Sequence, residues 1–235
     1  MKNILFYKFV EIEDIEETRK RLFELADSVN LLGTILIAEE GINGCLSGKG
    51  KDIKNFKAKI RKDKRFSDIE FKEGFAASHT FKRLAVKIRK EMITSGFGID
   101  ISKKADYIKP VELKRILDNK ENIVLLDARN RYECEIGKFK GAVTLQIKTF
   151  KEFKKSIKII KHLKNKKIIA YCTGGIRCEK ASALLKEKGF KNVQQLYGGI
   201  LNYGKECGDA HWEGKCFVFD TREAIDISPS IKSRL

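Results

Sequence analysis

The sequence predicts a mixed fold in which an α+β domain at residues 1–96 precedes an α/β domain at residues 113–211. In the first half, short apolar runs and amphipathic stretches follow one another as strand, helix, strand, strand, helix, strand. In the second half, continuous apolar runs are typical of parallel strands that are buried on both faces. We expect a linker at residues 97–112 and a C-terminal extension at 212–235.

The first domain is expected to contain four strands and two helices. The strands are predicted at residues 3–10, 34–38, 45–47 and 81–90, and the helices at 14–28 and 51–62. Asn43-Gly44 is a strong hairpin signal between the second and third strands. The order β-α-β-β-α-β is that of the ferredoxin-like fold.

The second domain alternates buried strands with helices. Strands are predicted at residues 123–127, 167–171 and 193–197, and helices at 150–163 and 179–188, with Gly189 as a helix C-terminal cap. This alternation predicts a parallel sheet. Ligands of such sheets bind at the carboxyl ends of the strands.

The chain is strongly basic and has no obvious membrane segment. Lys and Arg number 49 against 32 Asp and Glu, a net charge of +17. This excess favours a polyanionic partner. The alternative is that the lysines only cover solvent-exposed faces. The apolar run Ile4–Tyr7 is broken by Lys8, so we expect neither signal peptide nor membrane span, and a cytoplasmic protein. The six cysteines form no C-x-x-C pair and histidines are only three, so no metal site is expected.

Cys172 is the candidate reactive residue, because it directly follows a buried strand and precedes a helix. The loop that it opens comprises Cys172, Thr173, Gly174, Gly175, Ile176, Arg177 and Cys178. The paired glycines allow the backbone amides to turn inward, and the helix N-terminus adds positive potential. With Arg177 nearby, these groups are expected to lower the pKa of Cys172 and to keep an accessible thiolate. The alternative is a buried structural cysteine beside a glycine turn.

The spacing of the loop separates two chemistries. Cys172 and Arg177 form a C-x4-R pattern, one residue shorter than the C-x5-R loop that holds phosphate in cysteine phosphatases. The shorter loop fits an extra sulfur atom or a small oxidised group on the cysteine. Cys178 is either a resolving thiol for an oxidised Cys172 or a residue of the helix start.

Basic side chains alternate with apolar ones along the predicted strand 81–90. The candidate RNA-binding residues are His79, Phe81, Lys82, Arg83, Lys87, Arg89 and Lys90. A basic stripe with an aromatic side chain on the same face suits phosphate contacts and base stacking. An ordinary solvated face is the alternative.

The Cys172 loop, Asp127-Ala128-Arg129, the segment 135–142 and Gly198-Gly199-Ile200 together resemble the rhodanese fold. In rhodaneses the loop cysteine is a nucleophile that carries a persulfide, and the resemblance puts this role on Cys172 with Asp127 and Arg129 in support. The segments 172–180, 38–44 and 212–220 are similar to the tRNA uridine(34) hydroxylase family. This resemblance covers nearly the whole chain, although Lys138 stands where histidine is common and no Cys-rich C-terminal tail is present.

The resemblance implies an oxidoreductase that converts the wobble uridine of tRNA to 5-hydroxyuridine with molecular oxygen as co-substrate. The residues provide no flavin motif, haem cysteine or non-haem iron triad, so no cofactor is identified. Two other functions stay open. They are a sulfurtransferase that carries a Cys172 persulfide, and a non-catalytic RNA-binding module. The sequence does not predict the oligomeric state.

Overall fold

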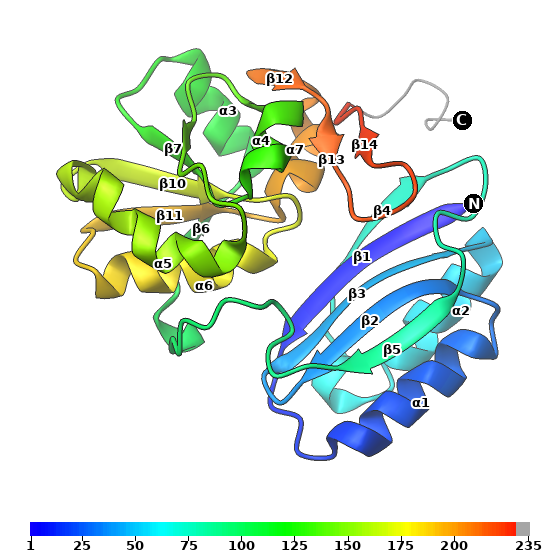
Figure 1. Ribbon diagram of the computed structural model, residues 1–235. Coiled ribbons are helices and arrows are strands. Elements are labelled where there is room, and N and C mark those ends of the chain that lie inside the picture. Colours follow the sequence, from blue (N-terminus) through cyan, green and yellow to red (C-terminus); the bar gives the residue numbers. More distant parts are fainter. Residues whose placement is uncertain (229–235) are drawn as a thin grey trace. The chain divides into compact units, whose positions relative to one another are not determined.

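A computed structural model of the protein describes residues 1–228, which divide into two compact units (Figure 1). The first unit comprises Met1–Thr94 with Asp220–Arg222, and the second comprises Ser95–Phe219 with the chain from Glu223 onward. Within residues 1–228, every helix is too short or too polar to cross a membrane. Each unit has its own sheet and its own hydrophobic core, and each is described by itself.

The first unit is a five-stranded sheet in the order β4-β1-β3-β2-β5. All neighbouring strands are antiparallel except β2 and β5, which run parallel. The strands are β1 (Lys2–Phe9), β2 (Leu32–Ala38), β3 (Gly41–Gly48), β4 (Phe71–Phe75) and β5 (Leu84–Ile88). The helices are α1 (Ile15–Asp27), α2 (Gly50–Ile60) and the 3-10 turn η1 (Lys64–Phe66).

The predicted ferredoxin-like fold is confirmed, but its last strand was assigned to the wrong segment. The strand that completes the β-α-β-β-α-β unit is β4, which pairs antiparallel with β1 at one sheet edge. Its residues 72–74 are Lys, Glu and Gly, so the apolar alternation that predicts strands is missing. The predicted strand 81–90 is an additional edge strand, β5, and is shorter because residues 82 and 83 form a bend.

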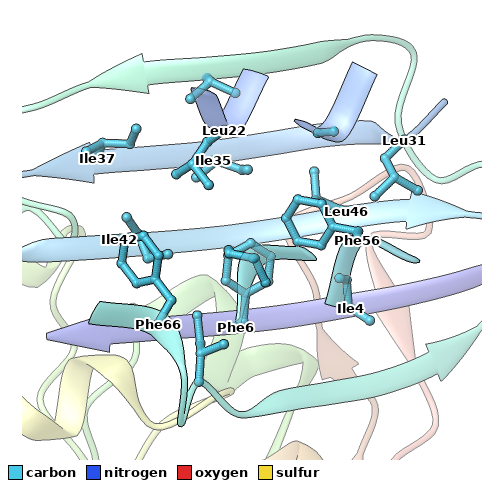
Figure 2. Close-up of a cluster of buried hydrophobic side chains, with 14 of the residues drawn as sticks. Ile4, Phe6, Leu22, Leu31, Ile35, Ile37, Ile42, Leu46, Phe56 and Phe66 are labelled. Atoms are coloured by element: carbon cyan, nitrogen blue, oxygen red, sulfur yellow. The ribbon is translucent and has the colours of Figure 1, made fainter. Parts of the chain in front are cut away.

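Helices α1 and α2 cover one face of this sheet (Figure 1), and the buried side chains of the core lie on that face (Figure 2). Ile4 and Phe6 of β1 and Ile35 and Ile37 of β2 point into this core, as their alternation predicts. Phe6 packs against Phe56 of α2 with ring centroids 5.9 Å apart. The intervening strand residues therefore lie on the face that the two helices leave uncovered.

The second unit is built on a parallel sheet in the order β6-β11-β10-β7-β9, which confirms the predicted α/β architecture. Its strands are β6 (Asp106–Ile108), β7 (Val124–Asp127), β9 (Val143–Thr144), β10 (Lys167–Tyr171) and β11 (Asn192–Leu196). The helices are α3 (Pro110–Asp118), α4 (Arg131–Ile136), α5 (Phe153–Ser156), α6 (Ile176–Glu187) and α7 (Gly199–Cys207).

Short elements complete the second unit. The 3-10 turns are η2 (Ile101–Lys103), η3 (Phe150–Glu152) and η4 (Ile157–Leu163), and the short strands are β8 (Gly137–Phe139), β12 (Trp212–Gly214), β13 (Cys216–Phe217) and β14 (Ala224–Ile225). The predicted continuous helix at 150–163 is wrong. It is divided into η3, α5 and η4, with non-helical backbone at Ile160.

Two segments outside the predicted second domain belong to its structure. The predicted linker 97–112 contains the edge strand β6 and the first turn of α3, which begins at Pro110. The predicted extension contributes β12, which pairs with β8 and buries Trp212 against Phe139 at a centroid distance of 5.2 Å. Residues 229–235 of that extension lie outside the described residues.

Helices α3 and α7 cover one face of the second sheet and α6 covers the other (Figure 1). Ile116 of α3 and Tyr203 of α7 pack with Leu125 and Ile169 of the sheet in one core. The carboxyl ends of β7 and β10 lie side by side, since Asp127 pairs with Tyr171. The segments that follow these two strands therefore meet at one edge of the sheet.

Candidate active site

The candidate site is the loop between β10 and α6, which places Cys172 immediately after the central strand. Gly175 has φ +101°, a conformation that favours glycine, and α6 begins at the next residue. The Gly175 N–H donates a hydrogen bond to Cys172 Sγ across 3.2 Å. The predicted helix start at residue 179 is corrected to Ile176, so Arg177 and Cys178 lie in the first helical turn.

The N-terminus of α7 fixes the backbone of this loop from one side. Ile200 N–H donates to the Cys172 carbonyl across 3.0 Å, and Leu201 N–H donates to the Thr173 carbonyl across 3.1 Å. Gly199 allows this approach, because a Cβ atom there would lie 2.4 Å from the Cys172 carbonyl oxygen. The N–H and C=O of one peptide point in opposite directions, so holding these two carbonyls toward α7 turns the N–H groups of Thr173 and Gly174 away from it.

The environment of Cys172 favours the thiolate. Burial alone would raise the pKa of Cys172, but a hydrogen bond from the Cys178 side chain, the charge of Arg177 and the amides of Cys178 and Gly175 lower it to about 6. Burial raises the pKa of Cys178 well above its ordinary value, and its hydrogen bond with Cys172 adds to this shift. As the pH rises, Cys172 is therefore the first cysteine of the loop to ionise, while Cys178 stays neutral and donates a hydrogen bond to it.

Arg177 is held in place by a buried ion pair with Glu133 of α4. Its two terminal nitrogens donate to the two carboxylate oxygens across 2.6 and 2.8 Å, and one of them also donates to Thr173 Oγ1 across 3.3 Å. The backbone N–H of Asn130 donates to the same carboxylate across 3.1 Å. This arrangement positions the cation against the loop, and such two-point pairing is specific to arginine.

The sulfur is less accessible than the sequence predicts. Cys172 has 0% exposure, so the expectation of an accessible thiolate is wrong for this state of the chain. The surroundings are nevertheless polar, since an amide, a second thiol and a guanidinium face the sulfur. Because Cys172 has no solvent-exposed surface, a substrate reaches the sulfur only when neighbouring groups move.

Asp127 and Arg129 form a second buried ion pair at the end of β7. Arg129 donates from Nε and from a terminal nitrogen to the Asp127 carboxylate, at 2.9 and 2.7 Å. It also donates to the Gly137 carbonyl across 2.6 Å, and its guanidinium lies over the rings of Tyr171 and Trp212. These contacts connect β7, β8 and β12, so the pair supports the framework around the loop without contacting the sulfur.

The predicted RNA-binding residues surround the edge strand β5 of the first unit. Lys87 lies on β5 beside Leu36, on the face opposite the hydrophobic core. The exposed cations of this segment are Lys82, Arg83, Lys87, Arg89 and Lys90, and none forms an ion pair within residues 1–228. His79 and Phe81 precede β5 and are half-buried. Phe81 is therefore not part of the strand whose alternating side chains form the predicted basic stripe. RNA binding by this segment stays a prediction.

Two features of the site were not singled out from the sequence. Glu133 is the partner of Arg177, and its position three residues after Asn130 is a helix-start pattern that could have drawn attention to it. Gly199 was noted only within a family-like segment. Its contact with the Cys172 loop depends on packing between elements that are far apart in the chain, which no local pattern reveals.

Comparisons with known proteins agree with this geometry. The family model described as UPF0176 acylphosphatase like domain matches residues 1–92, and the rhodanese-like domain model matches residues 109–206. A tRNA uridine(34) hydroxylase from Cytophaga hutchinsonii is 40% identical over 98% of this chain and 75% of its own length. Relatives of the same name from Legionella pneumophila strain Corby and Variovorax paradoxus strain S110 are each 42% identical, over 96% and 99% of this chain and 92% and 90% of their own lengths.

The α/β unit with its cysteine loop at the carboxyl end of the central strand is a rhodanese-like domain. It is joined here to an acylphosphatase-like domain of ferredoxin-like topology. The chain belongs to the tRNA uridine(34) hydroxylase family, as the resemblance in its sequence predicts.

Proposed function

We propose that this protein hydroxylates the wobble uridine, position 34 of tRNA, and thereby forms 5-hydroxyuridine. The observation that carries this proposal is identity of 40–42% with proteins named tRNA uridine(34) hydroxylase over nearly the whole chain. Both domains take part in that similarity, so the activity is proposed for the two together. The site of action is the cytoplasm, where tRNA is found.

Cys172 is the reactive residue in this proposal. Its thiolate is supported by the Gly175 amide, the Cys178 thiol and the Arg177 cation, which is the environment of reactive rather than structural cysteines. Molecular oxygen is the proposed co-substrate, with one oxygen atom entering the uracil ring and the other leaving as water. This balance requires two electrons and two protons from a reductant. The five cations near β5 that form no ion pair within residues 1–228 supply a sequence-independent attraction for the tRNA backbone.

Sulfur transfer is the second candidate, and the same loop favours it. A thiolate with a pKa of about 6 inside a rhodanese-like domain is suited to carry a persulfide. In that case the Cys172 thiolate would attack the outer sulfur of thiosulfate, forming a persulfide and releasing sulfite. Cyanide would then take the outer sulfur of the persulfide, giving thiocyanate and restoring the thiolate. Rapid thiocyanate formation by a protein that leaves tRNA unchanged would favour this second function.

Nucleoside analysis of tRNA tests the first proposal. Cells that lack this protein are compared with cells in which it is restored, and digested tRNA is measured by mass spectrometry. We expect 5-hydroxyuridine to be lost in the first sample and recovered in the second. Equal amounts in both samples would refute the proposed function.

A further inference from the structure

The rhodanese-like unit carries a group of aromatic side chains beside the Cys172 loop that the proposed reaction does not yet use. Tyr132 belongs to α4, and Phe217 and Phe219 belong to the family-like segment 212–220. The rings of Tyr132 and Phe217 are 5.1 Å apart at 83°, and those of Phe217 and Phe219 are 5.0 Å apart at 88°. The three side chains therefore form one continuous group, which we call the aromatic trio.

Two of the three side chains in the aromatic trio are exposed to solvent, although aromatic side chains are usually buried. Phe219 is 61% exposed and Tyr132 is 40% exposed, although α4 and β13 pack together below them. Burying an aromatic side chain normally stabilises a fold by about 1.5–3 kcal/mol, which this arrangement forgoes. Exposed aromatic side chains that gather beside a polar buried site are typical of ligand-binding surfaces.

Arg177 joins this surface to the reactive loop. The guanidinium carbon of Arg177 lies 5.8 Å from the centre of the Phe219 ring, and its nitrogens bind Glu133 and Thr173 within the loop region. Tyr132 directly precedes Glu133 in the chain. A flat ligand stacked on the exposed part of Phe219 would thus be separated by this one ring from the cation that faces Cys172.

We propose that the aromatic trio is the stacking platform for the substrate uracil, with Phe219 as its principal contact. This inference rests on the proposed function. An enzyme that modifies a nucleobase must first take that base out of its stack, and unstacked bases in RNA are held on aromatic rings and guanidinium planes. The net charge of +17 favours an anionic partner such as RNA over an apolar protein surface.

A tryptophan reporter tests whether a base stacks at this position. The variant Phe219→Trp is titrated with an anticodon stem-loop RNA that has uridine at position 34, and with the same RNA lacking that base. We expect strong fluorescence quenching by the first RNA and little by the second. Equal quenching by both RNAs would overturn the proposal. Quenching that appears without RNA as the protein concentration rises would also overturn it, because it would show that the ring packs against a second copy of the chain.

Binding measurements on substituted variants provide an independent test. We expect Phe219→Ala to weaken binding of the stem-loop by about 5- to 150-fold, the range that base stacking on aromatic side chains contributes, and Phe219→Leu to recover only part of it. Ile159→Ala is the matched control, because Ile159 is equally exposed in the same unit at 62%. Titration of Cys172 in Phe219→Ala should be unchanged, which shows that the loop is intact.

The failure of this inference is distinguishable from failure of the proposed function. If the wild-type protein forms 5-hydroxyuridine and Phe219→Ala binds and reacts equally well, the platform is refuted and the function stands. If the wild-type protein leaves tRNA unmodified but quenching still requires the base at position 34, the platform stands and the function is refuted.

Discussion

Cys172 combines two properties that rarely occur together, complete burial and a low pKa. Removal from water disfavours a charged thiolate, so the groups that face the sulfur must more than compensate for it. The Gly175 amide, the Cys178 thiol and the Arg177 cation do so. This balance separates Cys172 from the other five cysteines, whose pKa values burial raises.

The titration of this thiol is a first prediction. Because the folded pKa of about 6 lies below the ordinary value of 9.0, ionisation of Cys172 stabilises the fold fully above about pH 9. This contribution declines as the pH falls and is absent below about 6. We expect one thiolate to appear in the ultraviolet spectrum with a midpoint near 6, and Cys172→Ser to abolish it.

Arg177→Gln serves as the control for the cause of that shift. Loss of the cation should move the midpoint of the Cys172 titration upward, toward its ordinary value. A wild-type midpoint near 9 would contradict the proposed electrostatics of the loop. An unchanged midpoint in Arg177→Gln would show that the amides and Cys178 are sufficient without the cation.

At the scale of residues, the candidate loop could be predicted from the sequence because its chemistry is local. A cysteine after a buried strand, two glycines and an arginine are contiguous, and their positions around the strand end follow from that order. Glu133 could not be assigned to Arg177 in the same way, since the two are 44 residues apart. The burial of the sulfur was missed for a similar reason, because it depends on how elements that are distant in the chain pack around the loop.

Among the elements, α7 has the most direct influence on the reactive loop. Two amides at its N-terminus bind the carbonyls of Cys172 and Thr173, and its first residue must leave room for that approach. The backbone of Gly199, with φ +67°, also favours glycine. The helix therefore fixes the orientation of the two peptides that follow Cys172 and Thr173.

Substitution of this glycine is a second prediction. In Gly199→Ala, the new methyl group would lie 2.4 Å from the Cys172 carbonyl oxygen and 2.8 Å from the Gly175 nitrogen. We expect a loss of about 1–3 kcal/mol in the free energy of unfolding, measured with denaturant, together with an upward shift of the Cys172 pKa. The matched control is Gly141→Ala, since Gly141 has φ +68° but nothing within 4 Å. Equal effects in both variants would show that backbone strain, rather than the close approach, matters.

The strands of the first unit show where sequence patterns lose their information. Strands β1 and β2 were recognised from their apolar runs, whereas β3 was predicted only at residues 45–47. The predicted turn at Asn43-Gly44 is wrong, because residues 39 and 40 form the turn and both Asn43 and Gly44 pair with β2 inside β3. Strand β4 contains only two apolar residues, one at each end, and it is held at the sheet edge by its pairing with β1. A pairing between residues more than 60 positions apart leaves no local signal.

On the scale of the whole molecule, the excess of positive charge is the property that would attract the tRNA backbone. Composition alone could not decide between a polyanion-binding surface and solvated lysines, because it does not say which cations lack acidic partners. In the structure Lys57 pairs with Glu73, and Arg65 pairs with Asp14 and Asp63, whereas within residues 1–228 the cations around β5 have no such partner. These five cations are available to phosphates, and so are exposed lysines elsewhere that form no ion pair within residues 1–228, such as Lys54 and Lys59 of α2.

Neutralising the cations around β5 is a third prediction. The double variant Lys87→Gln and Arg89→Gln should bind tRNA more weakly, with a salt dependence shallower by about 0.7–0.9 for each phosphate that is no longer neutralised. Binding is measured by fluorescence anisotropy at several salt concentrations. The control removes the same charge from α2 with Lys54→Gln and Lys59→Gln, both exposed. A comparable weakening in the control would refute a specific role for β5.

Domain organisation at this scale was only partly visible in the sequence. The change from an α+β to an α/β pattern separates two architectures, but the segment 97–112 looked like a linker because β6 has only three residues. Pairing of β6 with β11 makes it part of the second sheet. The segment around Trp212 likewise joins this unit through β8, a pairing between residues about 75 positions apart that only the folded chain reveals.

Replacement of one sulfur atom by oxygen tests the central claim most directly. Cys172→Ser preserves the shape of the side chain but removes the thiolate on which the proposed reaction depends. The variant is expressed in cells that lack the wild-type protein, and position 34 of their tRNA is analysed by mass spectrometry. We expect 5-hydroxyuridine to be absent although the variant is folded and binds tRNA. Undiminished 5-hydroxyuridine would contradict a reaction centred on Cys172.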